Sequence, residues 1–225
     1  MLDTRSRKLL GSLILTAVSV VTLVVAPYTL IDPVNLPKLC VLAFFAIVAL
    51  SLFINNFKKI AQSRFKILLI LLSLFVFQII LVLIFSGANF GGQILGTFGR
   101  NTGALAYLSL AVFLMSSALI ANSDFIKKFL RVSVIVGIIL IIYGNIQYFN
   151  LDPLPFVTTY TVNAPVGTLG NSNFQSAFMG IIAVMAFSMA INSAFSMAVR
   201  AGLALTGFAA VIVIMKLSLS RVTLL

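Results

Sequence analysis

The sequence has no histidine, no glutamate and no tryptophan, and its only carboxylates belong to Asp3, Asp32, Asp124 and Asp152. These aspartates are scattered over termini and loops, so sequence neighbours cannot form paired acids, a nucleophilic triad or a metal cluster. The single cysteine, Cys40, cannot form an intrachain disulfide and indicates no redox compartment. The sequence therefore identifies no catalytic residue and predicts no metal or cofactor.

The sequence is rich in hydrophobic residues that form long continuous runs. Hydrophobic residues make up 61% of the 225 residues, charged residues only 8%, and the mean hydropathy is +1.20, values far from those of a soluble domain. Continuous runs of about 20 apolar residues suit a bilayer core about 30 Å thick. Such runs favour helices over the alternating strands of an outer-membrane barrel, because a helix satisfies its own backbone in lipid.

Seven runs predict an all-α polytopic membrane protein with about seven transmembrane helices in a single domain over residues 1–225. The predicted spans are Leu9–Ala26, Leu39–Ile54, Ile67–Phe85, Ala104–Ala121, Val132–Phe149, Phe174–Ile191 and Ala201–Met215. The first run has a second interpretation as a signal peptide, because basic residues precede it and residues 17–19 loosely resemble a cleavage site. Its continuation to Ala26 favours a retained helix.

The positions of lysine and arginine predict the orientation, since loops rich in these residues stay cytoplasmic. With the N-terminus in the cytoplasm, eleven of the fifteen basic residues lie on the cytoplasmic side: Arg5, Arg7, Lys8, Lys58, Lys59, Arg64, Lys66, Lys127, Lys128, Arg131 and Arg200. The opposite side receives the other four, Lys38, Arg100, Lys216 and Arg221. We therefore expect a multi-pass protein of the cytoplasmic membrane with its N-terminus inside.

A formal charge of +11 raises the question of nucleic-acid binding. The basic clusters, however, lie in short loops next to helix ends, where each contributes about 1 kcal/mol of attraction to an anionic lipid surface. The sequence therefore predicts membrane lipids as partners and no nucleic acid.

Two external loops, residues 86–103 and 150–173, are long and rich in Gly, Asn, Pro and Thr. In the first, Arg100 stands among neutral residues just before a helix. A guanidinium matches the oxygens of a phosphate or diphosphate, and a helix N-terminus favours an anion, with Asn101 or Thr102 as a cap or a ligand contact. The alternative is that Arg100 only reaches lipid headgroups at the interface.

In the second loop, Ser172 followed by Gln175 fits a capping box, with Asn173 as an alternative N-cap. The functional alternative is that the amides of Asn171 and Asn173 recognise sugar hydroxyls or phosphate. Before this loop, Tyr143 and Gln147 share one helix face. That face could line a groove for a polar headgroup, although an aromatic belt at the interface explains Tyr143 and Tyr148 equally well.

The segments "GRNTGALAYL", "VGTLGNSNFQSAFMG" and "LSLSR" resemble the N-terminal half of O-antigen ligase and polymerase-type membrane proteins. This resemblance implies a helical enzyme that moves a glycan from an undecaprenyl-diphosphate carrier to the lipid A core of lipopolysaccharide, a growing polysaccharide or a protein acceptor. Transfer would occur on the periplasmic face, without nucleotide or metal. By motif position, Arg100 and Arg221 would hold the carrier diphosphate, with Asn171 and Asn173 near the lipid-linked sugar.

Family members have about a dozen helices and a later loop bearing a histidine proposed as catalytic, whereas this sequence ends at Leu225 and has none. Either the reading frame is truncated, the interpretation we favour, or the protein binds without catalysing. The chain is therefore expected to be catalytically incomplete.

A transporter or permease subunit is the alternative class, but the sequence shows no internal repeat and no acidic residue deep in a run. A structural scaffold is a third interpretation, compatible with the Gly99 to Gly103 spacing.

Overall fold

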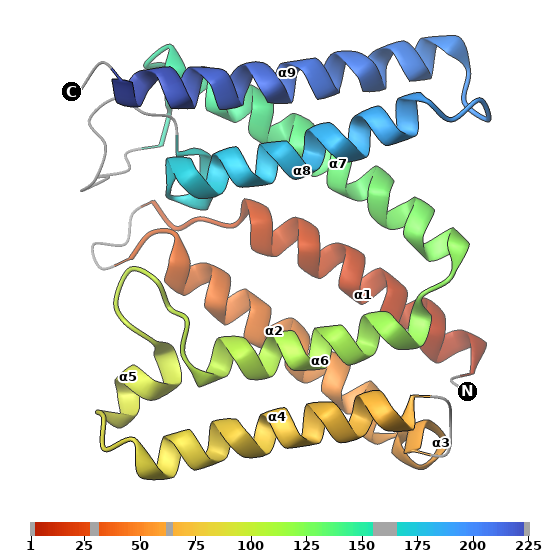
Figure 1. Ribbon diagram of the computed structural model, residues 1–225, viewed down its shortest axis with the longest axis vertical. Coiled ribbons are helices and arrows are strands. Elements are labelled where there is room, and N and C mark those ends of the chain that lie inside the picture. The colour runs from red at the N-terminus through yellow and green to blue at the C-terminus, as the bar shows by residue number, and fades with distance from the viewer. Residues whose placement is uncertain (1–2, 28–31, 62–64, 155–165, 223–225) are drawn as a thin grey trace. The chain divides into compact units, whose positions relative to one another are not determined.

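The computed structural model describes residues 3–27, 32–61, 65–154 and 166–222, and the side chains of all of these except Lys59 and 217–222. The described part of the chain is helical and contains no strand (Figure 1). Its elements are α1 (Thr4–Leu23), α2 (Asn35–Ile54), α3 (Phe57–Ala61), α4 (Lys66–Phe85), α5 (Phe90–Leu95), α6 (Ala104–Ile120), α7 (Ser123–Tyr148), η1 (Gly167–Leu169), α8 (Ser172–Ala190) and α9 (Met197–Val222).

Each of the seven predicted apolar runs coincides with one of the long helices, which confirms the all-α, membrane-like class. Among the described residues, five helices are long and apolar enough to cross a membrane, namely α1, α2, α4, α8 and residues Met197–Lys216 of α9. Helix α6 is apolar but shorter, with 17 residues. The count of seven spans and the orientation of the N-terminus stay predictions.

The two ends of α7 differ from the sequence expectation for local reasons. The helix begins at Ser123 rather than Val132, since the Asn122 side chain accepts a hydrogen bond from the Phe125 amide at 2.8 Å. It ends at Tyr148, one residue before the end of the predicted run. Asn150 has a left-handed φ of 57°, and the Leu151 amide donates to the Ile146 carbonyl at 3.0 Å. This is a Schellman ending, with asparagine in the position that glycine usually takes.

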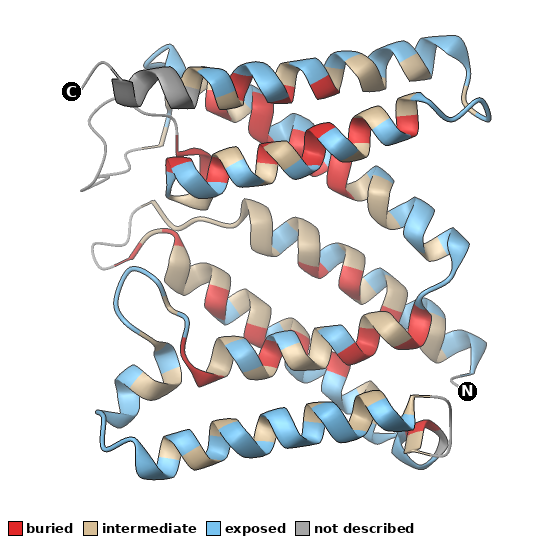
Figure 2. Cartoon of the chain, in the orientation of Figure 1, coloured by how far each residue is buried: buried red, intermediate tan, exposed pale blue. Residues whose placement is uncertain are grey.

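The chain forms two compact units, and it passes between them near the end of α1, just before α2 and within α7. The first comprises residues 1–21 and 35–128, and in it α6 packs on α2, α4 and α5. Its buried cores join the start of α1 to the ends of α2 and α6, through Leu10, Ala49 and Ile120, and join α3 to α6 through Ile60 and Leu119. Figure 2 shows that α4 exposes its surface along its whole length, and none of its residues is buried.

Charge is segregated between the two ends of this first unit. The start of α1, the segment around α3, the start of α4 and the end of α6 lie together (Figure 1). This end carries seven described basic residues, Arg5, Arg7, Lys8, Lys58, Lys66, Lys127 and Lys128. The opposite end, where α2 and α6 begin, carries Lys38 and Arg100. The arrangement is the one that the positive-inside rule requires of a membrane protein.

The second unit comprises residues 22–34 and 129–225, and its most extensive contact is between α8 and α9. Its core is formed by Leu140, Ile141, Met179, Ile182, Ala183, Ala210 and Val213. Two glycines allow close helix packing in this unit, Gly137 of α7 against α8 and Gly207 of α9 against α8. A Cβ atom on Gly137 would lie 2.5 Å from Cγ2 of Ile182, and one on Gly207 would lie 2.7 Å from a ring carbon of Phe187. Small residues at helix contacts are the usual means of close packing in membranes.

Candidate functional site

Arg100 lies on a closed loop, residues 96–103, between α5 and α6. The two ends of the loop touch, because a Cβ atom on Gly96 would lie 2.6 Å from the Gly103 amide nitrogen, and Gly96 has a φ of 86°. The tip is held against the start of α2, where the Asn35 side chain donates to the Gly99 carbonyl at 2.8 Å. The loop is therefore held both at its ends and at its tip, so the backbone of Arg100 has a defined position.

The Arg100 side chain is exposed, and no hydrogen bond or ion pair joins it to any residue that the structure describes. Lys38, the other basic residue at this end of the first unit, donates from its ammonium to the Val21 carbonyl at 2.8 Å. Of the two cations here, Arg100 is thus the one whose donors face outward without a described partner. A guanidinium in that state is available to an anion.

Of the two roles considered for Asn101 and Thr102, a helix cap or a ligand contact, the cap is wrong, and the ligand contact stays a prediction. The N-cap of α6 is Gly103, and no side chain makes a capping hydrogen bond there. Gly103 is buried against α5, since a Cβ atom on it would lie 2.5 Å from the Ile94 carbonyl carbon. Because this helix N-terminus is closed by α5, Arg100 itself is the feature of the loop that suits an anion.

At the start of α8, the capping box predicted for Ser172 and Gln175 does not form, and Asn173 is not the N-cap. The N-cap is Asn171, whose side-chain oxygen accepts from the Asn173 amide at 2.8 Å. The structure brings these two predicted site residues together, and both are exposed. Since capping occupies the Asn171 oxygen, its NH₂ group and the whole Asn173 amide remain for a ligand.

The Gln175 side chain is fully buried instead of capping the helix. Its amide lies over two glycines, 3.6 Å from the position of a Cβ atom on Gly144, while its Cδ would lie 2.7 Å from one on Gly167. Neither amide atom of Gln175 has a described hydrogen-bond partner. The side chain thus packs α8 against α7 and against the turn η1.

A polar network that the sequence did not predict surrounds Asp152. Its carboxylate accepts from the Tyr143 hydroxyl at 3.0 Å, from the Gln147 amide at 2.9 Å and from the Leu154 amide at 3.0 Å. The Gln147 oxygen in turn accepts from the Gly167 amide at 2.7 Å. The shared helix face of Tyr143 and Gln147 was predicted correctly, but it binds a carboxylate of the same chain. The only signal for this partner was an acidic residue just after the helix end.

Lys216 of α9 forms a second contact that the sequence did not predict. Its ammonium lies 4.3 Å from the ring centroid of Tyr148 and donates to the Asn145 side chain at 3.2 Å. The cation is thus held against the end of α7 by an aromatic face and an amide oxygen. Tyr148 therefore packs against the Lys216 ammonium within the second unit.

The predicted site residues fall in both units: Arg100 belongs to the first, and Asn171 and Asn173 to the second. Arg221 lies in the last turn of α9, among the side chains outside the described ones. Among the described residues, no group of three His, Cys, Asp or Glu side chains could hold a metal ion. Comparisons with models of protein families, with curated proteins and with solved structures found no match to this chain.

Proposed function

We propose that this protein acts on glycans at the outer face of the cytoplasmic membrane, in the manner of the O-antigen ligases and polymerases that its motifs resemble. The substrate would be a glycan on undecaprenyl diphosphate, and the acceptor a hydroxyl of lipid A core, a growing polysaccharide or a protein. The chain would span the membrane seven times with its N-terminus in the cytoplasm. Arg100 and Asn171 would then face the periplasm.

The observation that carries this proposal is the state of Arg100. It is an exposed guanidinium without a described partner, on a tied loop at the end of its unit that is poor in basic residues. A cation on the external side opposes the topological preference for positive charge inside, so it calls for a compensating function. Recognition of a diphosphate at the membrane boundary provides one, since each charge-assisted hydrogen bond contributes about 1.5–3 kcal/mol.

The other proposed residues would act on the rest of the substrate. Arg221 would share the diphosphate with Arg100, as the resemblance implies. Asn171 and Asn173 expose amide groups that donate and accept hydrogen bonds, which is the chemistry that reads sugar hydroxyls. These amides would hold the first sugar of the glycan.

The reaction breaks the bond between the anomeric carbon of the glycan and the diphosphate oxygen, and forms a bond from that carbon to the acceptor oxygen. The bonding electrons leave with the diphosphate, so negative charge grows on it in the transition state. Fixed guanidinium groups stabilise that charge. The proton of the acceptor hydroxyl passes to a base that none of the four proposed residues supplies.

A binding measurement tests the proposal without requiring turnover. The chain is reconstituted in lipid nanodiscs and titrated with undecaprenyl-diphosphate-linked glycan. Arg100→Ala should weaken binding about tenfold or more, because two or more charge-assisted hydrogen bonds are lost, and Arg100→Lys should recover part of the affinity.

The control is Lys127→Ala, which removes an exposed cation at the opposite end of the same unit. This variant should bind the lipid-linked glycan like the wild type. Equal affinities of Arg100→Ala and the wild type would refute the diphosphate clamp.

A further inference from the structure

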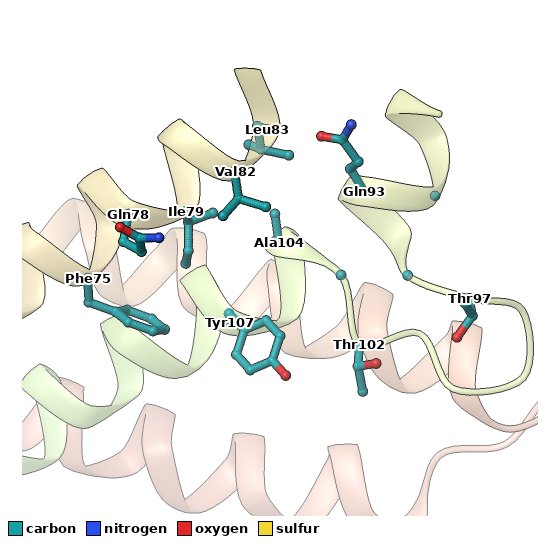
Figure 3. A pocket seen from close by; sticks show the side chains of 13 residues that line it. Phe75, Gln78, Ile79, Val82, Leu83, Gln93, Thr97, Thr102, Ala104 and Tyr107 are labelled. Carbon is teal, nitrogen blue, oxygen red and sulfur yellow. The ribbon is translucent and has the colours of Figure 1, made fainter. Parts of the chain in front are cut away.

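A pocket of about 470 Å³ lies between α4 and the segment that runs from α5 into α6 (Figure 3). Its volume falls within the range of roughly 300–1,000 Å³ that small-molecule sites occupy. The whole pocket belongs to the first unit, at the end that carries Arg100. It contains none of the four residues proposed above for glycan transfer.

The two sides of the pocket have different chemistry. The α4 side is mostly apolar, with Phe75, Ile79, Val82 and Leu83, and the opposite side brings Gln93, Thr97, Thr102 and Tyr107. No charged side chain lines the pocket. Such walls suit a molecule with an apolar chain and an uncharged polar group.

Gln78 is an unusual residue on a helix as apolar as α4, unless a polar group pairs with its side-chain amide. The helix is the most apolar of the five candidate spans and has no buried residue, so its surface is suited to hydrocarbon. The other neutral polar residue of α4, Ser73, bonds its hydroxyl to the Leu69 carbonyl at 2.8 Å. The Gln78 amide has no described partner and faces the pocket. An amide left unpaired in hydrocarbon is costly.

Across the pocket, Gln93 offers a second unpaired group. Its amide nitrogen donates to the Ala88 carbonyl at 2.5 Å, whereas its side-chain oxygen is buried without a described partner. In Figure 3 this oxygen is directed toward α4. A buried acceptor calls for a donor. One hydroxyl of a ligand would donate to Gln93, and another would pair with either end of the Gln78 amide.

We infer that this pocket binds a membrane phospholipid whose headgroup carries hydroxyls, with phosphatidylglycerol as the representative. The glycerol group lies between Gln78 and Gln93, and the adjoining chain lies along Phe75 and Ile79. The phospholipid enters the pocket from the bilayer along the exposed apolar surface of α4. The modest volume suits one glycerol headgroup better than a glycan of several sugars.

The experiment measures retained lipid by native mass spectrometry of the full chain in detergent, after incubation with defined lipids. Phosphatidylethanol is the matched competitor, because it carries the same phosphate charge but no hydroxyl. We expect one phosphatidylglycerol per chain, preferred over phosphatidylethanol by about tenfold. Gln78→Leu and Gln93→Leu should each remove most of this preference.

A second pair of variants tests the location. Ile79→Trp fills the pocket and should abolish retention, whereas Ile80→Trp, at a neighbouring position that is 45% exposed and outside the pocket, should not. If Ile79→Trp is unstable, Gln78→Leu decides, because it places an apolar side chain on an apolar helix.

Equal retention by the Ile79→Trp and Ile80→Trp variants would overturn the site. Equal binding of phosphatidylglycerol and phosphatidylethanol to the wild type would overturn the role of the hydroxyls. Displacement of phosphatidylglycerol by a polyprenyl-linked sugar would overturn the assignment to a phospholipid. Binding of the lipid-linked glycan at Arg100 does not enter any of these outcomes, so the inference fails or holds independently of glycan transfer.

Discussion

The backbone of Gly96 lies against that of Gly103, and this contact closes the loop that carries Arg100. Gly96 combines a φ of 86° with a ψ of −179°, a region that only glycine adopts readily. A side chain at this position would meet both the backbone restriction and the Gly103 amide nitrogen. The position of Arg100 therefore depends on a residue with no side chain.

Gly96→Ala should open the loop. We expect a loss of about 1–3 kcal/mol of unfolding free energy in mixed micelles, from overpacking and backbone strain together, and weaker binding of the lipid-linked glycan. Gly180→Ala is the control, because a Cβ atom there meets nothing within 4 Å. If Gly96→Ala kept both the stability and the affinity of the wild type, the loop would not be the support of Arg100.

Asp152 should be a structural residue of the second unit. Asp152→Asn places an NH₂ group among three donors, so at least one hydrogen bond to Tyr143, Gln147 or Leu154 is lost. We expect a loss of about 1–3 kcal/mol of unfolding free energy. Asp124→Asn, at an exposed position in the first turn of α7, should cost at most about 1 kcal/mol. Similar unfolding midpoints for both variants would show that the network contributes little.

The contact between Lys216 and Tyr148 can be measured with a double-mutant cycle. The single variants Lys216→Met and Tyr148→Leu and the double variant should give a coupling free energy of about 0.5–2 kcal/mol, the range for a cation over an aromatic face. The readout is unfolding in mixed micelles at low and high salt. A coupling free energy indistinguishable from zero at both salt concentrations would show that this contact does not stabilise the packing of α9 on α7.

The long helices were predictable because their determinants are local. A bilayer sets the length of an apolar run, and hydrocarbon obliges that run to satisfy its own backbone. The short helices α3 and α5 have only five and six residues, too few for a periodic pattern to reveal. Their existence depends on packing against the longer helices.

The details of the candidate site were less predictable, also for physical reasons. Asn171, Ser172 and Asn173 are all good N-caps, so the pattern could not decide among them. The partner of Gln147 depended on the turn at Asn150, which brings Asp152 back toward the helix. The pocket beside α4 arises from tertiary packing, although a glutamine in the most apolar helix was a visible signal.

Arg100 must lie outside the cytoplasm for the proposed function to hold. The most direct measurement uses Arg100→Cys in a Cys40→Ser background, because Cys40 is the only cysteine of the sequence and is exposed. Intact cells are treated with a membrane-impermeant maleimide, and Lys127→Cys in the same background serves as the matched position at the opposite end of the same unit. We predict labelling of position 100 in intact cells and labelling of position 127 only after permeabilisation. Labelling of position 100 only after permeabilisation would contradict the topology and, with it, the proposed recognition of a diphosphate at the outer face.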